Sequence, residues 1–328
     1  RIISPDQSQI TQLNEQSISL KVTNLPSKNA RAIYKTSGLD VRNYERLQMF
    51  VHAEKLIDDK TNLKDGEISV FVRIGSDIRS NYYEYEVPLR LTPEGNYNTY
   101  NENDQEAVWP ESNMIDFPLS LLTDAKKARN SAKSRGETGV SFGNPYSIYD
   151  PDKKRNRVTV VGNPSISNME SIVIGVRNNS PTTKDIVVWV NELRLSGFKQ
   201  DGGWGFKADA NLNISDLATL AGGTHIETAG FGSVDQALNE RRMEDYYQYN
   251  FSFMVDAGRF LPEKAKLKAP LYYSYYEERN MPKYNPLDED VLMDDALEAC
   301  ATKAEKDSLK NIVLDRSRTR SFSLTGFK

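Results

Sequence analysis

The chain has 328 residues, which is long enough for two domains. Hydrophobic residues make up 38% of it, so it can form a packed core, and a wholly disordered chain is excluded. The net charge is 42 − 46 = −4, too small to indicate binding to nucleic acid. Mean hydropathy is −0.62. No apolar run reaches about 18 residues, which excludes a transmembrane helix but not a transmembrane barrel, where half of each strand is polar.

The residues that usually carry chemistry are scarce. The single cysteine, Cys300, excludes a disulfide framework and a cysteine-rich zinc site. The two histidines, His52 and His225, have no Cys or His at metal-ligand spacing. The sequence contains no P-loop, no dinucleotide fingerprint and no nucleophile elbow. The chain is therefore predicted not to be an enzyme and to use no cofactor and no metal.

The first two thirds of the chain read as short strands. Residues 1–37 carry one short strand signal, at 18–22, and are predicted to be an approach segment. Residues 92–113 read as a loop and about 119–133 as a helix. Alternating runs that predict strands occur at 47–54, 67–74, 83–91, 157–161, 171–176 and 185–195. Together they predict a jelly-roll-like β-sandwich domain over residues 38–198.

Three longer alternating runs follow, at 205–215, 247–257 and 265–276. In the first, Phe206 and Leu212 share one parity, while Lys207 and Asp209 share the other. Because successive side chains of a strand point to opposite faces, each run is a strand with one apolar and one polar side. A weaker run at 218–231 contains glycines that suggest a bend or a bulge.

Strands with one apolar and one polar side occur in two environments. The apolar side can pack on a soluble core, or it can face lipid in the wall of a barrel. A length of about ten residues and tyrosines near strand ends favour the barrel. Lys207, Lys266 and Lys268 would each cost about 2–4 kcal/mol at the lipid midplane, so the polar parity is predicted to face a wet lumen.

The fold class predicted is all-β: part of a large antiparallel transmembrane β-barrel with an inserted jelly-roll-like β-sandwich and a few short helices. Residues 199–277 are predicted to form barrel strands, 278–317 an acidic helical insertion with one helix at about 294–311, and 318–328 the start of a further strand. Because an alternating run stops there in mid-pattern, the chain is expected to be a fragment. The residues predicted to face lipid are Phe206, Leu212, Ile214, Phe251, Phe253, Val255, Leu267 and Leu271. Those predicted to face the lumen are Lys207, Asp209, Asn211, Gln248, Asn250, Asp256, Lys266 and Lys268.

Three stretches carry a family resemblance: DVRNYERLQMFVHAE at 40–54, VWVNELRLSGF at 188–198, and LYYSYY at 271–276 followed by NPLDED at 285–290. They resemble the SprA (or Sov) family of Bacteroidetes, the outer-membrane translocon of the type IX secretion system. The resemblance implies a structural section of a protein-conducting barrel that also serves gliding motility. It implies an outer-membrane location with a periplasmic or cell-surface domain. The partners implied are secreted cargo proteins, a PorV-like shuttle barrel, a plug protein, a prolyl isomerase and outer-membrane lipid.

The alternative hypothesis is a secreted or surface carbohydrate-binding protein made of two sandwiches. Residues 186–195 resemble the closing strand of carbohydrate-binding jelly rolls, so Trp189 or Trp109 could present an indole to a sugar. This alternative predicts that Phe251 and Phe253 lie in a soluble core. A small-solute porin or plugged receptor is a third option.

Overall fold

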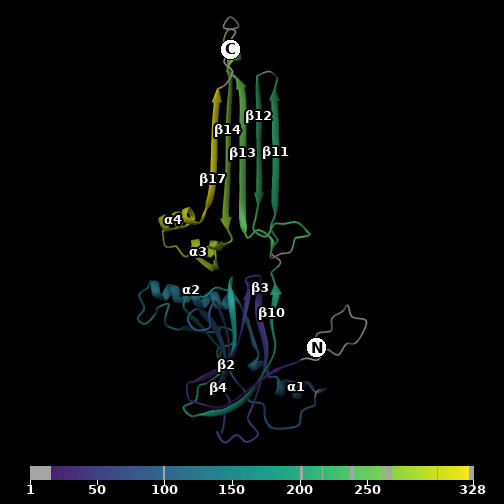
Figure 1. The fold of residues 1–328 in the computed structure, drawn as a ribbon, viewed down its shortest axis with the longest axis vertical. Helices are drawn as coiled ribbons and strands as arrows, with labels where there is room; N and C mark the ends of the chain where they lie inside the picture. Colours follow the sequence, from purple (N-terminus) through teal and green to yellow (C-terminus); the bar gives the residue numbers. More distant parts are fainter. Residues whose placement is uncertain are drawn as a thin grey trace. The chain divides into compact units, whose positions relative to one another are not determined.

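The structure is a computed structural model. It describes residues 16–98, 100–199, 202–215, 217–236, 240–260, 262, 268–300 and 302–324. The chain divides into two compact units, Arg1–Lys199 and Gln200–Lys328. Both are built mainly from antiparallel strands (Figure 1).

The first unit contains two sheets in its described residues. One has the order β1-β10-β3-β6 and the other the order β2-β9-β4-β5-β8-β7. The first strand thus pairs with the last and the second with the last but one, which is the nested pairing of a jelly roll. The strands are β1 Ile18–Leu25, β2 Ala30–Leu39, β3 Tyr44–Glu54, β4 Ile68–Gly75, β5 Tyr82–Pro88, β6 Ile115–Pro118, β7 Tyr146–Tyr149, β8 Arg157–Val161, β9 Met169–Asn178 and β10 Lys184–Phe198.

The core of this unit lies between the two sheets. Alternate residues of each strand point inward, so Val51 and Val188 from the first sheet and Val70 from the second belong to one buried cluster. The ring of Tyr85 on β5 stacks on Phe117 of β6, with their centroids 4.1 Å apart. The unit is therefore a sandwich, as the sequence predicts.

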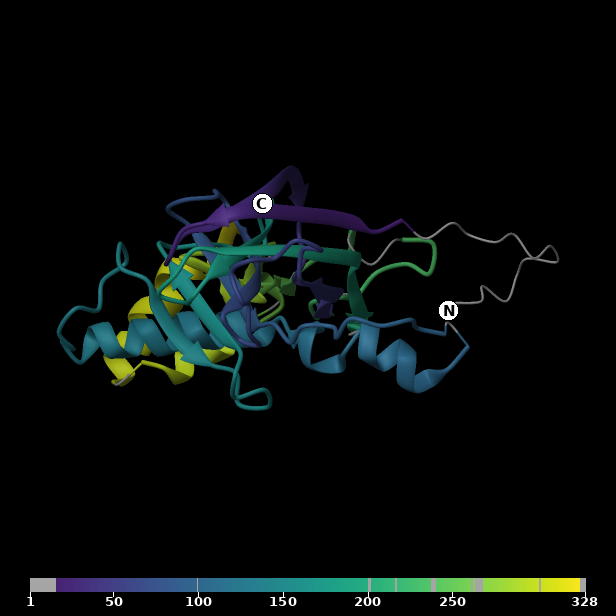
Figure 2. The same ribbon diagram turned by 90° about the horizontal axis from the view of Figure 1, so that it is seen from below.

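Helix α2 (Ser120–Ser134) packs its apolar side on the sandwich (Figure 2). Leu121, Leu122 and Ala125 lie at helical spacing and are buried in the core cluster. Lys126 is buried too, and its Nζ donates a hydrogen bond to the carbonyl oxygen of Pro164 at 2.9 Å. The helix predicted at about 119–133 is confirmed.

Two parts of the sandwich differ from the sequence interpretation. Residues 92–113 are not only a loop: they include α1 (Glu102–Val108), capped by the side chain of Asn101, and the 3-10 turn η1 (Glu111–Asn113). Within the predicted approach segment, β1 pairs with β10 and β2 pairs with β9. Strand β2 is an edge strand and mostly exposed, so it needs no apolar alternation and leaves little signal in the sequence.

The second unit is built on one long antiparallel sheet with the order β11-β12-β13-β14-β17. Its strands are β11 Gly205–Ile214, β12 Ala218–Glu227, β13 Glu244–Asp256, β14 Pro270–Pro282 and β17 Asp315–Leu324. Strands β11, β12 and β17 have 10 residues and β13 and β14 have 13. Gly222 and Gly223 make no bend or bulge, because β12 keeps an unbroken register with both neighbours, and for them that expectation is wrong. Gly230 lies after β12 in a turn, where its φ is +89°.

The segment between β14 and β17 holds a small pair of strands and two helices. The pair is β15 (Tyr284–Asn285) and β16 (Asp288–Leu292), and the helices are α3 (Met293–Glu298) and α4 (Lys303–Val313). The single helix predicted at 294–311 is therefore wrong. Thr302 starts a new helix because its side chain and that of Glu305 form a capping box. Another short element, the 3-10 turn η3 (Ala257–Phe260), follows β13.

The outer face of the six-stranded sheet of the sandwich carries an ion network. Glu84 binds Arg73 and Arg177, with N–O distances of 2.7 and 2.8 Å. Glu86 binds Arg177 and also Arg157, the latter at 2.5 Å. The two carboxylates are only 4% and 5% exposed, and removing Glu86 would leave the Arg157 guanidinium without its carboxylate counter-ion.

The network sets a pH dependence of stability. Burial alone would raise the pKa of Glu86, but the hydrogen bond from Ser69 and the guanidinium groups of Arg177 and Arg157 outweigh it and lower that pKa below 4.5. A carboxylate whose pKa is lowered by folding stabilises the native state above its unfolded-state pKa. That contribution is lost as the pH falls through the lowered pKa.

We predict that Glu86→Gln lowers the free energy of unfolding of the sandwich by about 3 kcal/mol at neutral pH, because Arg157 loses its carboxylate and Arg177 keeps only Glu84. Urea unfolding followed by the fluorescence of Trp109 and Trp189 measures this. The difference from wild type should shrink below the ordinary carboxyl pKa, where wild-type Glu86 also becomes protonated. The exposed Glu170 on β9 is the control, and Glu170→Gln should change little. An equal loss in both variants would contradict the prediction.

Candidate functional site

The long sheet of the second unit has one apolar face. Residues directly paired across neighbouring strands share a face, and the row Leu212, Leu220, Phe253, Tyr273 and Phe322 crosses all five strands. The next row is Ile214, Ala218, Val255, Leu271 and Leu324. Apolar side chains of all five strands are thus aligned into one continuous surface, here called the apolar face.

The apolar face is open. Phe206 is 51% exposed, Leu212 56%, Phe251 41% and Phe322 69%, so within the described residues no second layer covers this face. An apolar surface that crosses five strands is unusual on a soluble monomer and indicates contact with lipid or a partner. Of the residues predicted to face lipid, those on this face are Phe206, Leu212, Ile214, Phe251, Phe253, Val255 and Leu271. Leu267 lies outside the described residues.

The opposite surface, here called the polar face, carries the other parity. One row joins Lys207, His225 and Gln248, and the next joins Asp209, Gly223 and Asn250. Asn211 and Asp256 lie on the same face. Of the other predicted lumen residues, Lys268 lines a hollow of about 270 Å³ together with Asp256, and Lys266 lies outside the described residues.

A glycine shapes the centre of the polar face. A Cβ added at Gly223 would lie 2.5 Å from Asp209 Oδ1 and 2.6 Å from Asn250 Oδ1. Because glycine has no side chain, these two polar groups can approach each other above β12. Beside them is a shallow hollow of about 310 Å³ whose lining includes Asn211 and Tyr276.

Charged residues interrupt the apolar parity at one end of β14 and β17. Four arginines lie there, and we call them the arginine rim: Arg279, Arg316, Arg318 and Arg320. Among them lies Glu277, which is only 4% exposed. This cluster was not predicted from the sequence, because β14 extends beyond the predicted end at residue 276 and β17 begins before the predicted start at residue 318. The period-two spacing of Arg316, Arg318 and Arg320 was the available signal.

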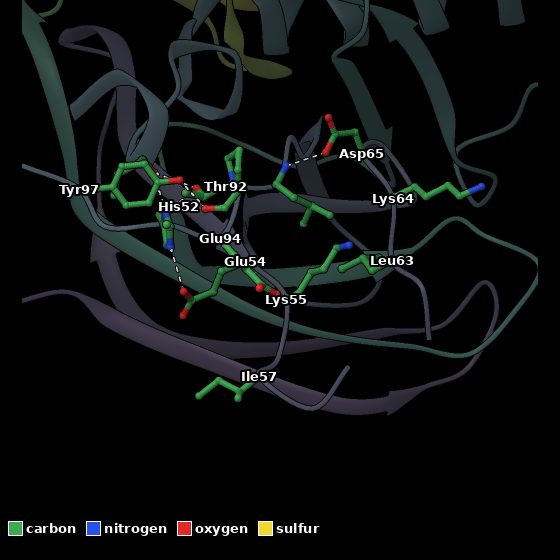
Figure 3. Close-up of a pocket in the computed structure, with 14 residues that line it drawn as sticks. His52, Glu54, Lys55, Ile57, Leu63, Lys64, Asp65, Thr92, Glu94 and Tyr97 are labelled. Atoms are coloured by element: carbon green, nitrogen blue, oxygen red, sulfur yellow. Dashed lines mark hydrogen bonds and ion pairs between the residues drawn. The ribbon is translucent and has the colours of Figure 1, made fainter. Parts of the chain in front are cut away.

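A second candidate site is a hollow of about 1160 Å³ in the sandwich (Figure 3). His52 lies at its wall, with Nδ1 2.6 Å from the carbonyl oxygen of Val108 and 3.0 Å from Thr92 Oγ1. Its Nε2 lies 3.6 Å from a carboxylate oxygen of Glu54. Tyr97 lies beside this group, and its hydroxyl donates to the carbonyl oxygen of Pro93. Most polar groups at this wall are thus engaged within the protein.

The tryptophans of the carbohydrate hypothesis flank His52 but do not line this hollow. Trp189 pairs with His52 across the strands and is half-buried on the outer side of the sheet, not in the core. Its Nε1 donates to Glu54 Oε1 at 3.0 Å. Trp109 packs against His52 and Phe50, with ring centroids 5.7 and 6.4 Å away. The structure therefore joins both tryptophans in a packed polar and aromatic cluster.

The remaining candidates do not assemble a catalytic or metal site. His225 lies 2.9 Å from a carboxylate oxygen of Glu227, and Cys300 Sγ lies 3.4 Å from the carbonyl oxygen of Ala296. Among the residues that the structure describes, no group of three or more His, Cys, Asp and Glu is placed to hold a metal ion. Within the same residues, no helix is both long and apolar enough to cross a membrane.

Comparison with known proteins places the chain in a family. No curated protein matches it. A family model named SprA_N, described as a motility related/secretion protein, matches residues 1–297. The match covers the sandwich, strands β11 to β14, the β15–β16 pair and most of α3, and it ends before α4. On this match, which confirms the resemblance seen in the sequence, the chain belongs to the SprA_N family of motility-related and secretion proteins.

Proposed function

We propose that this chain is a structural section of an outer-membrane protein-conducting translocon that serves type IX secretion and gliding motility. The observation that carries the proposal is the open five-stranded sheet, which exposes an apolar face on one side and a polar face on the other. A family role in motility and secretion supports it. In this role the apolar face contacts lipid and the polar face lines the passage for cargo.

Strand length fits a membrane wall. A tilted strand needs about 9–11 residues to cross the hydrocarbon. The five strands have 10 or 13 residues, whereas strands of globular proteins usually have about five or six. Both edge strands, β11 and β17, offer unpaired backbone groups that lipid cannot satisfy. Further strands of the full-length protein must therefore pair with them to complete the wall.

The border of the apolar face steps across the sheet. On β11, β12 and β13 the apolar parity extends to the same level, at Phe206, Ile226 and Tyr247. On β14 it ends at Tyr275, which is 279 − 275 = 4 residues short of that level, and on β17 it ends at Phe322, which is 322 − 316 = 6 residues short. Tilted strands in a membrane wall produce a border that differs from strand to strand, because each strand leaves the hydrocarbon at a different residue.

The polar face suits the passage of protein. It combines cationic, anionic and amide groups, such as Lys207, Asp209 and Asn250, with no single concentrated charge. A wet wall of mixed charge favours no one small solute and holds no cargo tightly. The carbohydrate alternative loses support because Phe251 lies on an open face and not in a second core, and because the indole of Trp189 is bound to Glu54.

We predict that Phe253→Arg blocks insertion of the full-length protein into the outer membrane, since an arginine near the lipid midplane costs about 2–4 kcal/mol. Asn250→Arg is the matched control on the polar face and should insert nearly as wild type does. The amount of protein in the membrane fraction after a urea wash measures both. Equal tolerance of the two substitutions would contradict the assignment of faces.

Cysteine scanning along 247–257 tests the same assignment residue by residue. In a Cys300→Ser background, we predict that a water-soluble maleimide labels cysteines at the parity of Gln248 and Asn250 and spares those at the parity of Phe251 and Phe253. The protein must be assayed in intact outer-membrane vesicles. The same alternation in a protein that fractionates as soluble would contradict the membrane wall and favour a sandwich.

A photo-crosslinker tests the passage of cargo. When it is placed at Asn211 on the polar face, we predict that ultraviolet light traps secreted cargo during transport. When it is placed at the neighbouring Leu212 on the apolar face, no cargo should be trapped. Immunoblotting of the cross-linked product measures this. Cargo trapped from neither position, in a strain that secretes normally, would argue against a translocon wall.

A further inference from the structure

The arginine rim lies where the apolar face ends. On β14 the apolar parity runs from Leu271 through Tyr273 to Tyr275 and then becomes charged. On β17 it runs from Leu324 to Phe322 and is then occupied by Arg320, Arg318 and Arg316. The charged residues thus share a face with the apolar ones and lie at one end of them.

The rim is organised around one buried carboxylate. Glu277 Oε1 lies 2.6 Å from Arg279 Nε, 2.5 Å from Arg316 Nε and 3.6 Å from Arg318 Nη2. The fourth arginine, Arg320, lies over the ring of Tyr275, 5.5 Å from its centroid. In the described part of the chain, Glu277 is the carboxylate that pairs with this group.

One carboxylate cannot neutralise four guanidinium groups. The rim carries a net charge of 4 − 1 = +3. Arg279 and Arg316 are also directly opposite each other, an arrangement of like charges that destabilises a sheet, and the single carboxylate of Glu277 lies between them. Arg316, Arg318 and Arg279 remain about 40% exposed, so their unused N–H donors are accessible from outside. The rim is therefore prepared to bind a further anion.

We propose that the arginine rim binds the phosphate group of an anionic membrane lipid whose acyl chains lie on the apolar face. This inference rests on the proposed function, in which that face contacts lipid. Guanidinium groups bind phosphate oxygens through two parallel hydrogen bonds, which lysines cannot do. Tyrosines such as Tyr273 and Tyr275 suit the boundary between acyl chains and headgroups, because the ring is apolar and the hydroxyl is polar.

The position of the rim favours lipid over a secreted cargo protein or a soluble acidic partner. Its side chains are on the parity opposite to the polar face, so cargo in the passage would not meet them. The three arginines of β17 begin at the position directly after the last apolar residue of the same parity, Phe322, where a strand that leaves the hydrocarbon meets the headgroups. Charge, position and face thus agree on a lipid headgroup.

The test uses the full-length protein, tagged and purified in neutral maltoside micelles that contain a tail-labelled fluorescent lipid. The probes are phosphatidic acid and zwitterionic phosphatidylcholine, each captured with the protein on beads and measured as fluorescence per protein. We expect wild type to retain roughly tenfold more phosphatidic acid than phosphatidylcholine per protein, since each arginine near an anionic headgroup layer adds attraction. High salt should reduce this preference, because exposed charges are screened.

The double variant Arg318→Gln/Arg320→Gln keeps the two arginines closest to Glu277. It should reduce the ratio of retained phosphatidic acid to retained phosphatidylcholine to nearly one. Lys207→Gln/Lys268→Gln removes the same charge from the polar face and should leave the preference at the wild-type value. Both variants must first appear in the urea-washed membrane fraction. If wild type itself fails to appear there, the proposed function fails. If wild type inserts but shows no salt-sensitive preference, only the present inference is overturned.

Two further outcomes identify a different ligand. Inorganic phosphate that displaces phosphatidic acid at low concentration, and binds equally well without lipid, would assign the rim to a free anion. Loss of a co-purifying acidic protein from the arginine variant, with lipid retention unchanged, would assign it to a protein partner. Either result overturns the assignment to a lipid headgroup.

Discussion

The second unit depends on an unbroken antiparallel register across its five strands. Because side chains alternate with a period of two, a slip of one residue between β11 and β12 would exchange the faces of β11 and place Lys207 on the same face as Phe253. The register has no irregularity from β11 to β17. Gly223 of β12 supports it, since a side chain there would collide with Asp209 and Asn250. The separation of an apolar face from a polar face follows from this one constraint.

The same alternation has a different outcome in each unit. In the sandwich, the apolar parity of β3 and β10 meets that of β4, and Val51, Val188 and Val70 are buried between two sheets. In the long sheet, the equivalent parity meets no other layer in the described residues, and Phe322 is 69% exposed. Burial of apolar surface is the main driving force of folding, so the second unit must obtain it from outside itself. Membrane lipid supplies such a surface without a second sheet.

Sequence reasoning succeeded where periodicity was long and failed where structure came from distant pairing or local caps. The runs containing Phe206 and Phe253 predicted strands and faces, because ten alternating residues leave little ambiguity. Strand β2 was not predicted, since an exposed edge strand takes its conformation from β9 and not from its own pattern. The break between α3 and α4 depends on the cap at Thr302, which a helical pattern alone does not reveal. The arginine rim needed the pairing of β14 with β17 before its members could be brought together.

The rim also changes how the alternation itself is interpreted. A charge on the apolar parity, such as Glu277, would count against a membrane strand if the strand were considered alone. Across five paired strands, however, the charged positions form a compact group beyond a border that steps between β13 and β17, and no charged residue lies on the apolar parity on the other side of that border. A tilted wall requires such a border, because each strand leaves the hydrocarbon at a different residue. The charges on β14 and β17 therefore mark where the apolar layer ends, and they support the membrane interpretation.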